Sequence, residues 1–259
     1  MTEIPAYPTG RDLLRGKTVL LTAAAGTGIG FATAKRCVEE GARVVISDTH
    51  ERRLGEAGKV LSEIAGAEVP ALRCDVTVES DVRALISGAI AKLGHIDVLV
   101  NNAGLGGTAN VVDMTDDQWH RVLDVTLTGT FRMTRAALRH MMDRGSGAIV
   151  NNASVLGWRA QPGQAHYAAA KAGVMALTRC SAMEAAAKGV RVNAVSPSLA
   201  MHAFLSKVTS AELLADLTER EAFGRAAEPW EVANVIVFLA SDLASYMTGE
   251  VVSVSSQHP

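Results

Sequence analysis

Short runs of apolar and β-branched residues alternate with longer amphipathic stretches along almost the entire chain. The runs typical of strands are KTVLLT at 17–22, RVVISD at 43–48, EVPALRCDV at 68–76, IDVLVNN at 96–102, GAIVNN at 147–152, VRVNAVS at 190–196 and EVVSVS at 250–255. Strands separated by helices require crossover connections, which produce a mainly parallel sheet with helices on both faces. The pattern therefore predicts an α/β fold with seven strands in one doubly wound sheet.

The longer stretches show helical spacing. Between 116 and 140 the apolar positions are Trp119, Val122, Leu123, Leu127 and Phe131, which predicts an amphipathic helix. The stretch 168–188 is rich in small helix-forming residues. Pro229, which follows Glu228, is typical of the first position of another helix.

The pattern continues from about residue 17 to the end of the sequence, which favours one domain. We expect residues 1–15 to form an N-terminal arm and residues 16–259 to form that domain. Residues 198–225 read as a helical excursion between the last two strands, near their carboxyl ends. Loops in that position are suited to cover a substrate.

Composition excludes several classes of function. Hydrophobic residues make up 48% of the chain and the formal net charge is -2, so nothing favours binding to nucleic acid or to anionic lipid. The apolar runs are too short to span a bilayer, and the first residues contain no apolar stretch typical of a signal peptide. An odd number of cysteines, Cys37, Cys74 and Cys180, without metal-binding spacing, favours a reduced, cytoplasmic protein without a metal site.

Tyr167 and Lys171 lie four residues apart in HYAAAKAG, and Ser154 lies thirteen residues upstream of the tyrosine. Residues separated by four share one face of a helix, so the ammonium would lie beside the phenol and favour its ionised form. A phenol tuned in this way is usable as an acid or base. The spacing alone also fits a packed ring beside a solvated amine, and further motifs are needed to decide between the two interpretations.

A glycine-rich turn, TAAAGTGIG, leads from the first strand into a helix and contains Gly26, Thr27, Gly28, Ile29 and Gly30. Such glycines let the backbone approach a pyrophosphate, which the free N–H groups and dipole of the helix then face. The string does not follow the simple G-x-G-x-x-G pattern, but its place between a strand and a helix predicts a nucleotide site.

Asp48 ends the second strand, eighteen residues beyond Gly30. A carboxylate there can accept hydrogen bonds from ribose hydroxyls and would repel a 2′-phosphate, so NAD(H) is favoured over NADP(H). Arg52 and Arg53 follow closely and could weaken that repulsion. A solvated or helix-capping aspartate is the alternative.

Together these motifs resemble the short-chain dehydrogenase/reductases, which have a single-domain Rossmann-type fold. The match extends over nearly the whole chain and rests on TAAAGTGIG, CDV at 74–76, NNAG at 101–104, the residues Ser154, Tyr167 and Lys171, SPS at 196–198 and SDLASYMTGE near the end. The resemblance implies hydride transfer between the nicotinamide and a carbinol carbon. Tyr167 would exchange the proton, Lys171 would lower the tyrosine pKa and hold the nicotinamide ribose, and Ser154 would bind the substrate oxygen.

The resemblance also implies further cofactor contacts. Asp75 and Val76 would flank the adenine, and Asn102, Ala103 and Gly104 would brace the central strand. Residues 195–198, including Pro197 and Ser198, would touch the nicotinamide.

Three positions depart from the pattern of the family. Thr126 occupies the place of an asparagine that supports a water connecting the lysine to solvent, and a threonine lacks the amide geometry for that relay. The glycine turn is one residue longer, with Ala24 at a usual glycine. The family's Pro-Gly is Pro197-Ser198, and His202 stands at the place of a later threonine.

The candidate substrate pocket consists of 105–108, 156–164 and 199–222, which include Trp158 and Arg159. This mixture suits a bulky, largely apolar alcohol or ketone. The stretches ISDTHERRLGE, NNASVLGWRAQ, AFGRAAEPWEV and TGEVVSVSSQ resemble actinobacterial members associated with steroid-ring breakdown, which act on ring-derived coenzyme A thioesters.

Alternatives remain open at this point. Reduction of plain 3-oxoacyl thioesters is one, oxidation of steroids or other secondary alcohols is another, and a catalytically impaired nucleotide-sensing protein on the same fold is a third. The family pairs through the helices at about 116–140 and 166–188, and the second of these has Ala and Met where a solvated face would be charged. We therefore expect a homotetramer.

Overall fold

Seven parallel strands form one sheet in the order β3-β2-β1-β4-β5-β6-β7. The structure is a computed structural model that describes residues 2–201 and 211–257. The strands are β1 (Thr18–Leu21), β2 (Arg43–Asp48), β3 (Ala71–Arg73), β4 (Val98–Asn101), β5 (Gly147–Asn152), β6 (Val190–Pro197) and β7 (Val251–Val254). All of these strand pairs run parallel. The predicted fold class is confirmed.

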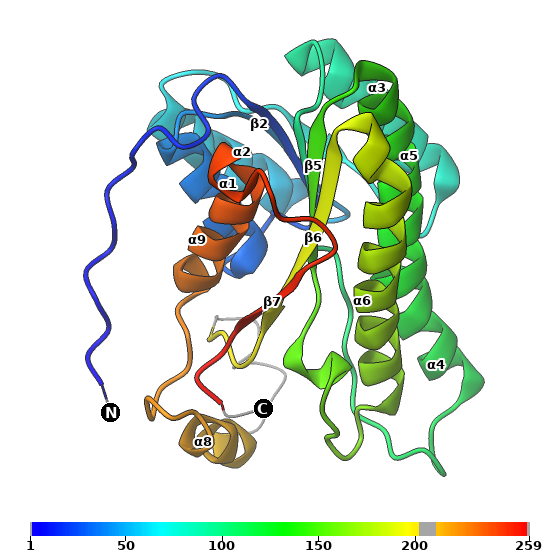
Figure 1. Ribbon diagram of the computed structural model, residues 1–259. Coiled ribbons are helices and arrows are strands. Elements are labelled where there is room, and N and C mark those ends of the chain that lie inside the picture. The colour runs from blue at the N-terminus through cyan, green and yellow to red at the C-terminus, as the bar shows by residue number, and fades with distance from the viewer. Residues whose placement is uncertain (1, 202–210, 258–259) are drawn as a thin grey trace.

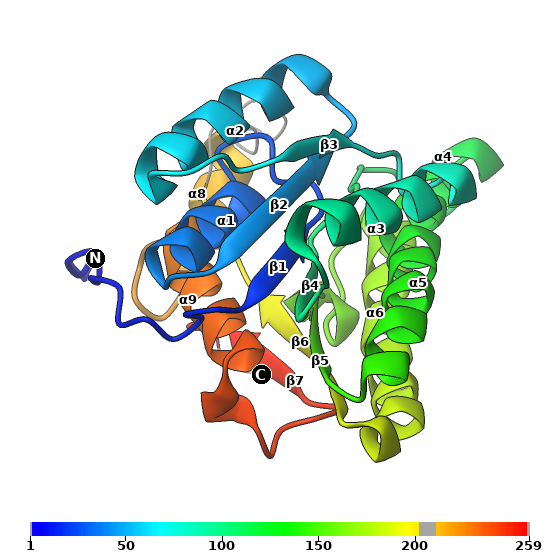
Figure 2. The same ribbon diagram turned by 90° about the horizontal axis from the view of Figure 1, so that it is seen from above.

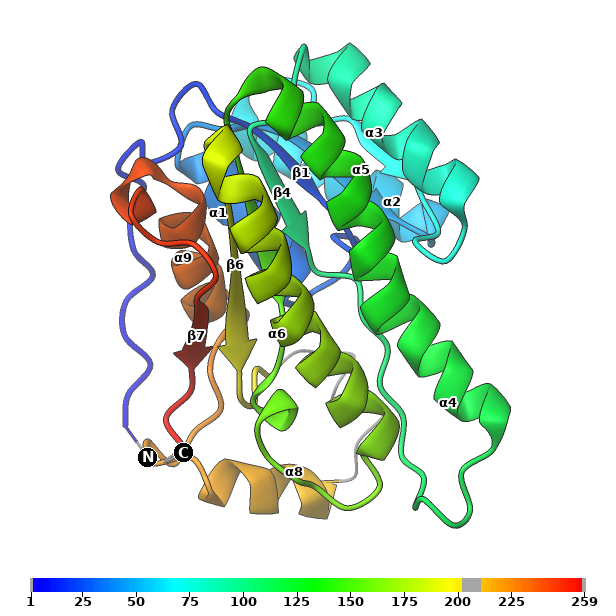
Figure 3. The same ribbon diagram turned by 45° about the vertical axis from the view of Figure 1, so that its right-hand side comes forward.

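Helices cover both faces of the sheet (Figures 1 and 2). The helices α1 (Ile29–Glu39), α2 (Glu51–Ala65) and α9 (Pro229–Ala240) lie on one face. The opposite face carries α3 (Glu79–Leu93), α4 (Asp116–Leu123), α5 (Gly129–Arg144) and α6 (Ala165–Ala185). A separate helix, α8 (Ala211–Glu219), lies beyond the carboxyl ends of β6 and β7 (Figure 3). It belongs to the predicted excursion, of which residues 202–210 are outside the described residues.

The core has two main parts, one on each face of the sheet, because side chains alternate between the faces along each strand. In β1, Leu21 packs with the α1 and α9 side, whereas its neighbour Leu20 packs with the α3 and α5 side. In β2, Ile46 and Val45 divide in the same way. Because adjacent residues of a strand point to opposite faces, a strand buried on both sides reads as a continuous apolar run. Full burial of one such side chain contributes about 1.5–3 kcal/mol.

Two segments are shorter or less regular than predicted. The run at 68–76 forms only β3, which begins directly after Pro70, a residue without an N–H to donate to a neighbouring strand. Cys74 lies just beyond the strand that was expected to contain it. The predicted helix at 116–140 extends to Arg144 and is interrupted by a π-helical segment, Asp124–Thr128.

The start of α9 agrees with its prediction. The Glu228 N–H donates to the Glu231 carboxylate at 2.8 Å, and Pro229 takes the first helical position. The Arg225 guanidinium pairs with both oxygens of Glu231 at 2.7 and 2.8 Å. Its side-chain hydrogen bond lowers the pKa of Glu231. These contacts fix the chain between α8 and the helix layer.

Residues 2–12 contain no helix or strand and run along the outside of α1 and α9 (Figure 1). The Tyr7 ring packs edge-on against Trp230 with ring centroids 5.5 Å apart, and its hydroxyl donates to Glu39 at 2.6 Å. The division into an arm of residues 1–15 and a domain of 16–259 stays a prediction. Over the described ranges, no helix has the length and apolar character that crossing a membrane requires.

Candidate active site

Several of the predicted site residues lie where strands of the sheet end. Asp48 ends β2 and Pro197 ends β6, while Asn102 directly follows β4. Asn152, which was not predicted, ends β5. Strands β1 and β4 are neighbours in the middle of the sheet. The connections leave these two strands in opposite directions, and ligands bind to such sheets at the carboxyl end of that switch point.

Ser154 and Tyr167 meet beside the end of β5. Ser154 precedes the 3₁₀ helix Val155–Gly157, and its hydroxyl accepts a hydrogen bond from the Leu156 N–H at 3.2 Å. Tyr167 is half-buried in the first turn of α6. Burial raises the pKa of Tyr167, and a hydrogen bond with the Ser154 side chain lowers it. The two hydroxyls are thus close enough to bind one substrate oxygen between them.

Lys171 is buried one turn further along α6. Its Nζ donates to the Asn152 carbonyl at 2.5 Å and lies 5.5 Å from the centroid of the Tyr167 ring. Burial lowers the pKa of Lys171 to about 8. The expected lowering of the tyrosine pKa by this amine is not what the structure shows, because burial dominates and Nζ is directed at a backbone oxygen.

Thr126 lies in the π-helical segment and is fully buried. Its hydroxyl accepts from the Leu105 N–H at 2.9 Å and donates to the Leu105 carbonyl at 3.1 Å. A hydroxyl has one proton to donate, so this proton is committed to the backbone. A Cβ at Gly104 would lie 3.4 Å from Lys171 Nζ and 3.8 Å from Thr126 Oγ1. Thr126 therefore holds the backbone that faces the lysine.

The glycine turn has the features of an anion cradle. Helix α1 begins at Ile29 with Gly28 as its N-cap, and within the described chain no side chain caps it and its first turn is free of acidic residues. A Cβ at Gly26 would meet no described heavy atom within 4 Å, whereas one at Gly30 would lie 2.2 Å from the Ala23 carbonyl oxygen. The turn therefore offers exposed N–H groups to a phosphate and packs tightly behind them.

The turn is also irregular at a position that the sequence did not indicate. Ala23 has φ 52°, in the left-handed region that glycine favours. Ala24, which stands where the family usually has a glycine, is buried. Asn102 stabilises this conformation, because its Nδ2 donates to the Ala23 carbonyl at 3.0 Å. The Thr22 hydroxyl accepts from the N–H groups of Asn102 and Ala103.

Asp48 is fixed by its neighbours at the end of β2. Its carboxylate accepts from the Ala25 N–H at 3.2 Å and from the His50 N–H at 3.0 Å. Arg52 pairs with Glu56 at 3.0 Å. The residue that lies beside Asp48 in the sheet register is Arg73, which pairs with Glu51 and Asp81.

The remaining predicted cofactor residues differ in the hydrogen bonds and packing contacts that they already make within the protein. Asp75 accepts from the N–H and the hydroxyl of Thr77 at 2.9 and 2.7 Å. Val76 is buried against Gly129, where a Cβ would lie 2.6 Å from it. The Ser198 N–H donates to Val254 at 3.3 Å just after β6. The prediction for His202 falls outside the described residues.

Comparison with known proteins identifies the family. A family model described as Enoyl-(Acyl carrier protein) reductase matches residues 23–256. The crystal structure of a short chain dehydrogenase from Mycobacterium smegmatis is 60% identical, with a TM-score of 0.89 and coverage of 99% of both chains. The chain belongs to the short-chain dehydrogenase/reductase family. It is a nicotinamide-dependent oxidoreductase.

Two further relatives bear on the chemistry of this dehydrogenase. The (5R,7aS)-5-hydroxy-7a-methyl-1-oxo-2,3,5,6,7,7a-hexahydro-1H-indene-carboxyl-CoA reductase of Mycobacterium tuberculosis is 66% identical over 260 residues, covering 100% of this chain and 99% of the relative. The crystal structure of an NAD+-bound xylitol dehydrogenase is 33% identical, has a TM-score of 0.88, and matches over 94% of this chain and 99% of its own.

The predicted substrate loops of the dehydrogenase lie together. Gln164 Nε2 donates to the Gly107 carbonyl at 2.7 Å, and the Ala109 N–H donates to Gly163 at 3.0 Å. Gly106 approaches Tyr167, since a Cβ there would lie 3.8 Å from the ring. The structure thus joins the segments at 105–108 and 156–164 beside the tyrosine.

Two groups of residues near this site were not predicted. Asn152 positions Lys171 through its backbone carbonyl, a role that no side-chain pattern reveals. The Glu221 carboxylate and the Gln257 amide connect the candidate substrate segments to residues after β7. These contacts span 35 and 36 residues, so no local spacing in the sequence indicates them.

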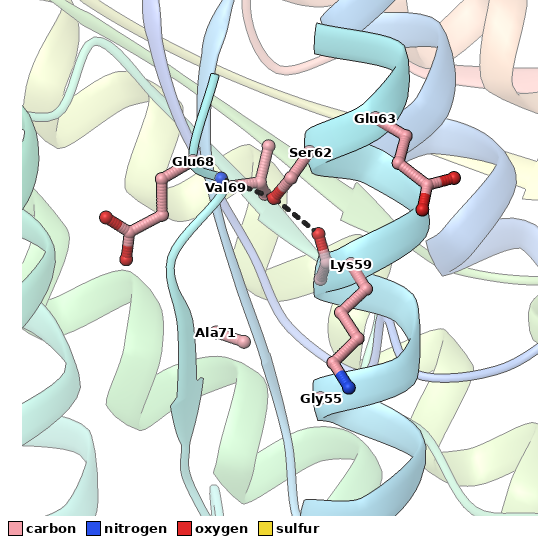
Figure 4. A pocket seen from close by; sticks show the side chains of 8 residues that line it. Gly55, Lys59, Ser62, Glu63, Glu68, Val69 and Ala71 are labelled. Carbon is pink, nitrogen blue, oxygen red and sulfur yellow. Dashed lines mark hydrogen bonds between the residues drawn. The ribbon is translucent and has the colours of Figure 1, made fainter. Parts of the chain in front are cut away.

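Two surface hollows of the dehydrogenase lie away from this site. One of about 420 Å³ is bounded by α2 and the chain before β3, where Ser62 donates to Gly58 and accepts from the Val69 N–H (Figure 4). The other, of about 630 Å³, lies beside α4. In the part of the chain that the structure describes, no three His, Cys, Asp or Glu side chains are grouped to hold a metal ion.

Proposed function

We propose that this enzyme transfers a hydride between NAD(H) and the carbinol or keto carbon of a bulky, ring-derived acyl-coenzyme A thioester of steroid breakdown. The observation that carries the proposal is the 66% identity over the full chain with a reductase named for a hydroxy-methyl-oxo-hexahydroindene carboxyl-CoA. A second support is the group formed by Ser154, Tyr167 and Lys171 beside the glycine turn, which a purely nucleotide-sensing protein would not need.

The bound nicotinamide supplies the hydride acceptor or donor, and the protein handles the accompanying proton. In the oxidation direction, the phenolate form of Tyr167 takes the hydroxyl proton of the substrate at Oη, while the hydride leaves the carbon that bears that hydroxyl. Ser154 Oγ holds the substrate oxygen next to Oη, as its contact with the tyrosine supports. Lys171, whose Nζ lies 5.5 Å from the centroid of the Tyr167 ring, would bind the nicotinamide ribose. Reduction reverses each of these steps.

The residues around the turn fit a dinucleotide. The N–H groups at Gly26, Thr27, Gly28 and Ile29 would bind the pyrophosphate, and Asp48 would accept from the adenosine ribose. Asp75 and Val76 would flank the adenine, and Pro197 and Ser198 would contact the nicotinamide. The fixed Asp48 carboxylate supports NAD(H) over NADP(H). Asn102, Ala103 and Gly104 would support the cradle from the end of β4.

Thr126 belongs to the site as a positioning residue in this proposal. Its two hydrogen bonds with Leu105 hold the backbone opposite Lys171. Where the family has a side chain that binds a water, this threonine hydrogen-bonds directly to the backbone of Leu105. Turnover would therefore depend on Thr126 less than on Tyr167.

A cytoplasmic location and a homotetrameric assembly complete the proposal. Free Cys37 and Cys74 are buried, and burial raises the pKa of both thiols to about 12. Such thiols stay protonated and unreactive, whereas Cys180 is a free and exposed thiol, which a reducing compartment would keep unoxidised.

The test is turnover of the purified enzyme with each nicotinamide cofactor and a matched panel of substrates. The panel contains a bicyclic ketoacyl-CoA thioester, its free acid, a linear 3-oxoacyl-CoA and a simple ketone, so that every substrate is reduced. We expect the bicyclic thioester to give the highest kcat/KM, with NAD(H) preferred. A higher kcat/KM for the linear 3-oxoacyl thioester would show that the proposed substrate class is wrong.

A further inference from the structure

Glu221 is a buried carboxylate between α8 and α9 that is only 3% exposed. Its Oε1 accepts from the Leu199 N–H at 3.3 Å and from Gln257 Nε2 at 2.9 Å, and its Oε2 accepts from the Ser256 hydroxyl at 2.7 Å. Desolvation makes a buried carboxylate costly unless its oxygens are hydrogen-bonded. Three donors from two distant segments meet this requirement.

The Gln257 amide extends this contact toward the active site. Its side-chain oxygen and its backbone carbonyl both accept from the Arg159 guanidinium, the latter at 3.3 Å. One amide therefore bridges a buried carboxylate and a guanidinium, donating to the first and accepting from the second. We call Arg159, Glu221, Ser256 and Gln257 the Glu221 junction.

Both ends of the junction lie close in sequence to predicted site residues. Arg159 follows the turn that begins at Ser154, and its N–H donates to the Val155 carbonyl at 3.0 Å. Leu199 directly follows Ser198 at the end of β6. The Ala222 N–H also donates to the Ser256 carbonyl at 3.1 Å. The junction thus ties the loop after Ser154, the end of β6 and the segment before α9 into one unit.

We propose that Glu221 is a positioning residue that fixes the substrate-facing loop 155–164 through Gln257 and Arg159. The inference rests on the proposed function in one respect, since it assumes that this loop binds the acyl portion of the substrate. Glu221 does not touch the reacting atoms in this account. It acts by holding Arg159 and Leu199 in the geometry that the site requires.

The hydrogen-bond pattern distinguishes two substitutions at this position. In Glu221→Gln, the amide oxygen can still accept from Leu199 and Gln257, and the new amide N–H₂ can donate to Ser256, because a serine hydroxyl can also accept. In Glu221→Ala, all three donors lose their partner. The glutamine variant should therefore behave like the parent enzyme, and the alanine variant should not.

Steady-state kinetics with the bicyclic thioester provide the first measurement. Glu221→Ala should raise KM roughly tenfold with kcat changed about twofold or less, the pattern for lost substrate positioning. Gln257→Ala removes the link between Glu221 and Arg159 but leaves the carboxylate in place, and it should also raise KM. Glu63→Ala, at an exposed position on α2 outside the predicted site segments, is the control and should leave both constants unchanged.

Hydrogen exchange of the amides at 155–164 provides a second measurement that needs no substrate. Exchange there should be faster in Glu221→Ala and Gln257→Ala, and unchanged in Glu221→Gln and Glu63→Ala. NADH titration checks that each variant is folded. If the parent enzyme turns over no thioester, the substrate assignment fails while the exchange data still test the junction. Unchanged exchange in a folded Glu221→Ala, or equal damage from Glu221→Gln, would overturn the inference.

Discussion

At the scale of single residues, the chemistry of the site depends on two polar groups held away from water. Burial raises the pKa of Tyr167 and lowers that of Lys171 to about 8. Both shifts favour the neutral form, as expected when desolvation dominates. The Ser154 hydroxyl and the Asn152 carbonyl are the partners that fix these two side chains. Small changes to the side chain of Ser154, Tyr167 or Lys171 should therefore have large effects.

Removal of the tyrosine hydroxyl is the most direct test of the proton transfer. Tyr167→Phe keeps the ring and should leave folding and NADH affinity unchanged. Turnover should fall about 10²- to 10⁴-fold, the usual contribution of a general acid or base. Steady-state kinetics and NADH titration on the same preparation measure both. Near-normal turnover by the folded variant would contradict the proposed role.

Lys171 makes a pH-dependent contribution to stability. Its pKa is about 8 in the folded protein and 10.5 ordinarily, so between these values the unfolded chain binds a proton that the folded chain does not. The stability of the parent relative to Lys171→Met should therefore rise with pH across this window, by up to about 3 kcal/mol. Urea unfolding at several pH values measures the difference, with exposed Lys188→Met as the control. A difference independent of pH would show that the amine is not desolvated.

Asp48 should decide the choice of cofactor. Asp48→Asn removes the charge but keeps the shape, so it should weaken NADH binding about tenfold or more, because hydrogen bonds to charged groups contribute about 1.5–3 kcal/mol. It should also relieve the repulsion of a 2′-phosphate and narrow the gap between NADH and NADPH. Fluorescence titration with both cofactors measures the ratio. The same ratio in variant and parent would remove Asp48 from the cofactor site.

At the scale of elements, the glycine turn separates two roles that the sequence could not distinguish. A Cβ at Gly30 would meet the Ala23 oxygen at 2.2 Å and Asn102 Nδ2 at 2.5 Å, whereas a Cβ at Gly26 meets no described atom within 4 Å. Gly30 is thus required for packing of α1, and Gly26 is free to serve a ligand.

We expect Gly30→Ala to destabilise the protein by more than about 2 kcal/mol, because a backbone oxygen cannot move aside cheaply, and to lose NADH binding as well. Gly26→Ala should keep its thermal midpoint but weaken NADH, since only the approach of a phosphate is obstructed. Thermal unfolding and NADH titration of both variants test the contrast. An equal fall in the thermal midpoint of the two variants would contradict the separate roles of Gly26 and Gly30.

Prediction from sequence succeeded where the pattern of apolar residues reflects burial in the core. RVVISD and GAIVNN became β2 and β5 with the predicted bounds, because the middle residues of strands covered on both faces are apolar. It failed where contacts between residues distant in the sequence determine the backbone conformation. Neither the left-handed Ala23 nor the π-helical segment around Thr126 has a local signature, since partners at Asn102 and Leu105 hold them.

At the scale of the whole molecule, long-range polar contacts hold the outer segments against the sheet. Glu40 is buried and accepts from the N–H groups of Arg11 and Leu13 at 2.8 and 3.1 Å, and it also pairs with buried Arg36. Near the carboxyl ends of β6 and β7, the Glu221 junction ties residues after β7 to the substrate loop. Two buried carboxylates thus anchor segments that have little regular structure of their own.

The outer surface of α5 and α6 carries apolar side chains that no described part of the chain covers fully. Met183 on α6 is 82% exposed and Phe131 on α5 is 40% exposed. Exposed apolar groups on neighbouring helices favour association between copies of a chain. We therefore expect sedimentation equilibrium to give a homotetramer, a particle about four times the 27.2 kDa of one chain. Met183→Glu, which places a charge on this surface, should shift the distribution toward smaller species and leave NADH affinity unchanged. A 27.2 kDa particle at micromolar concentration would show that the enzyme acts as a monomer and that these side chains serve another purpose.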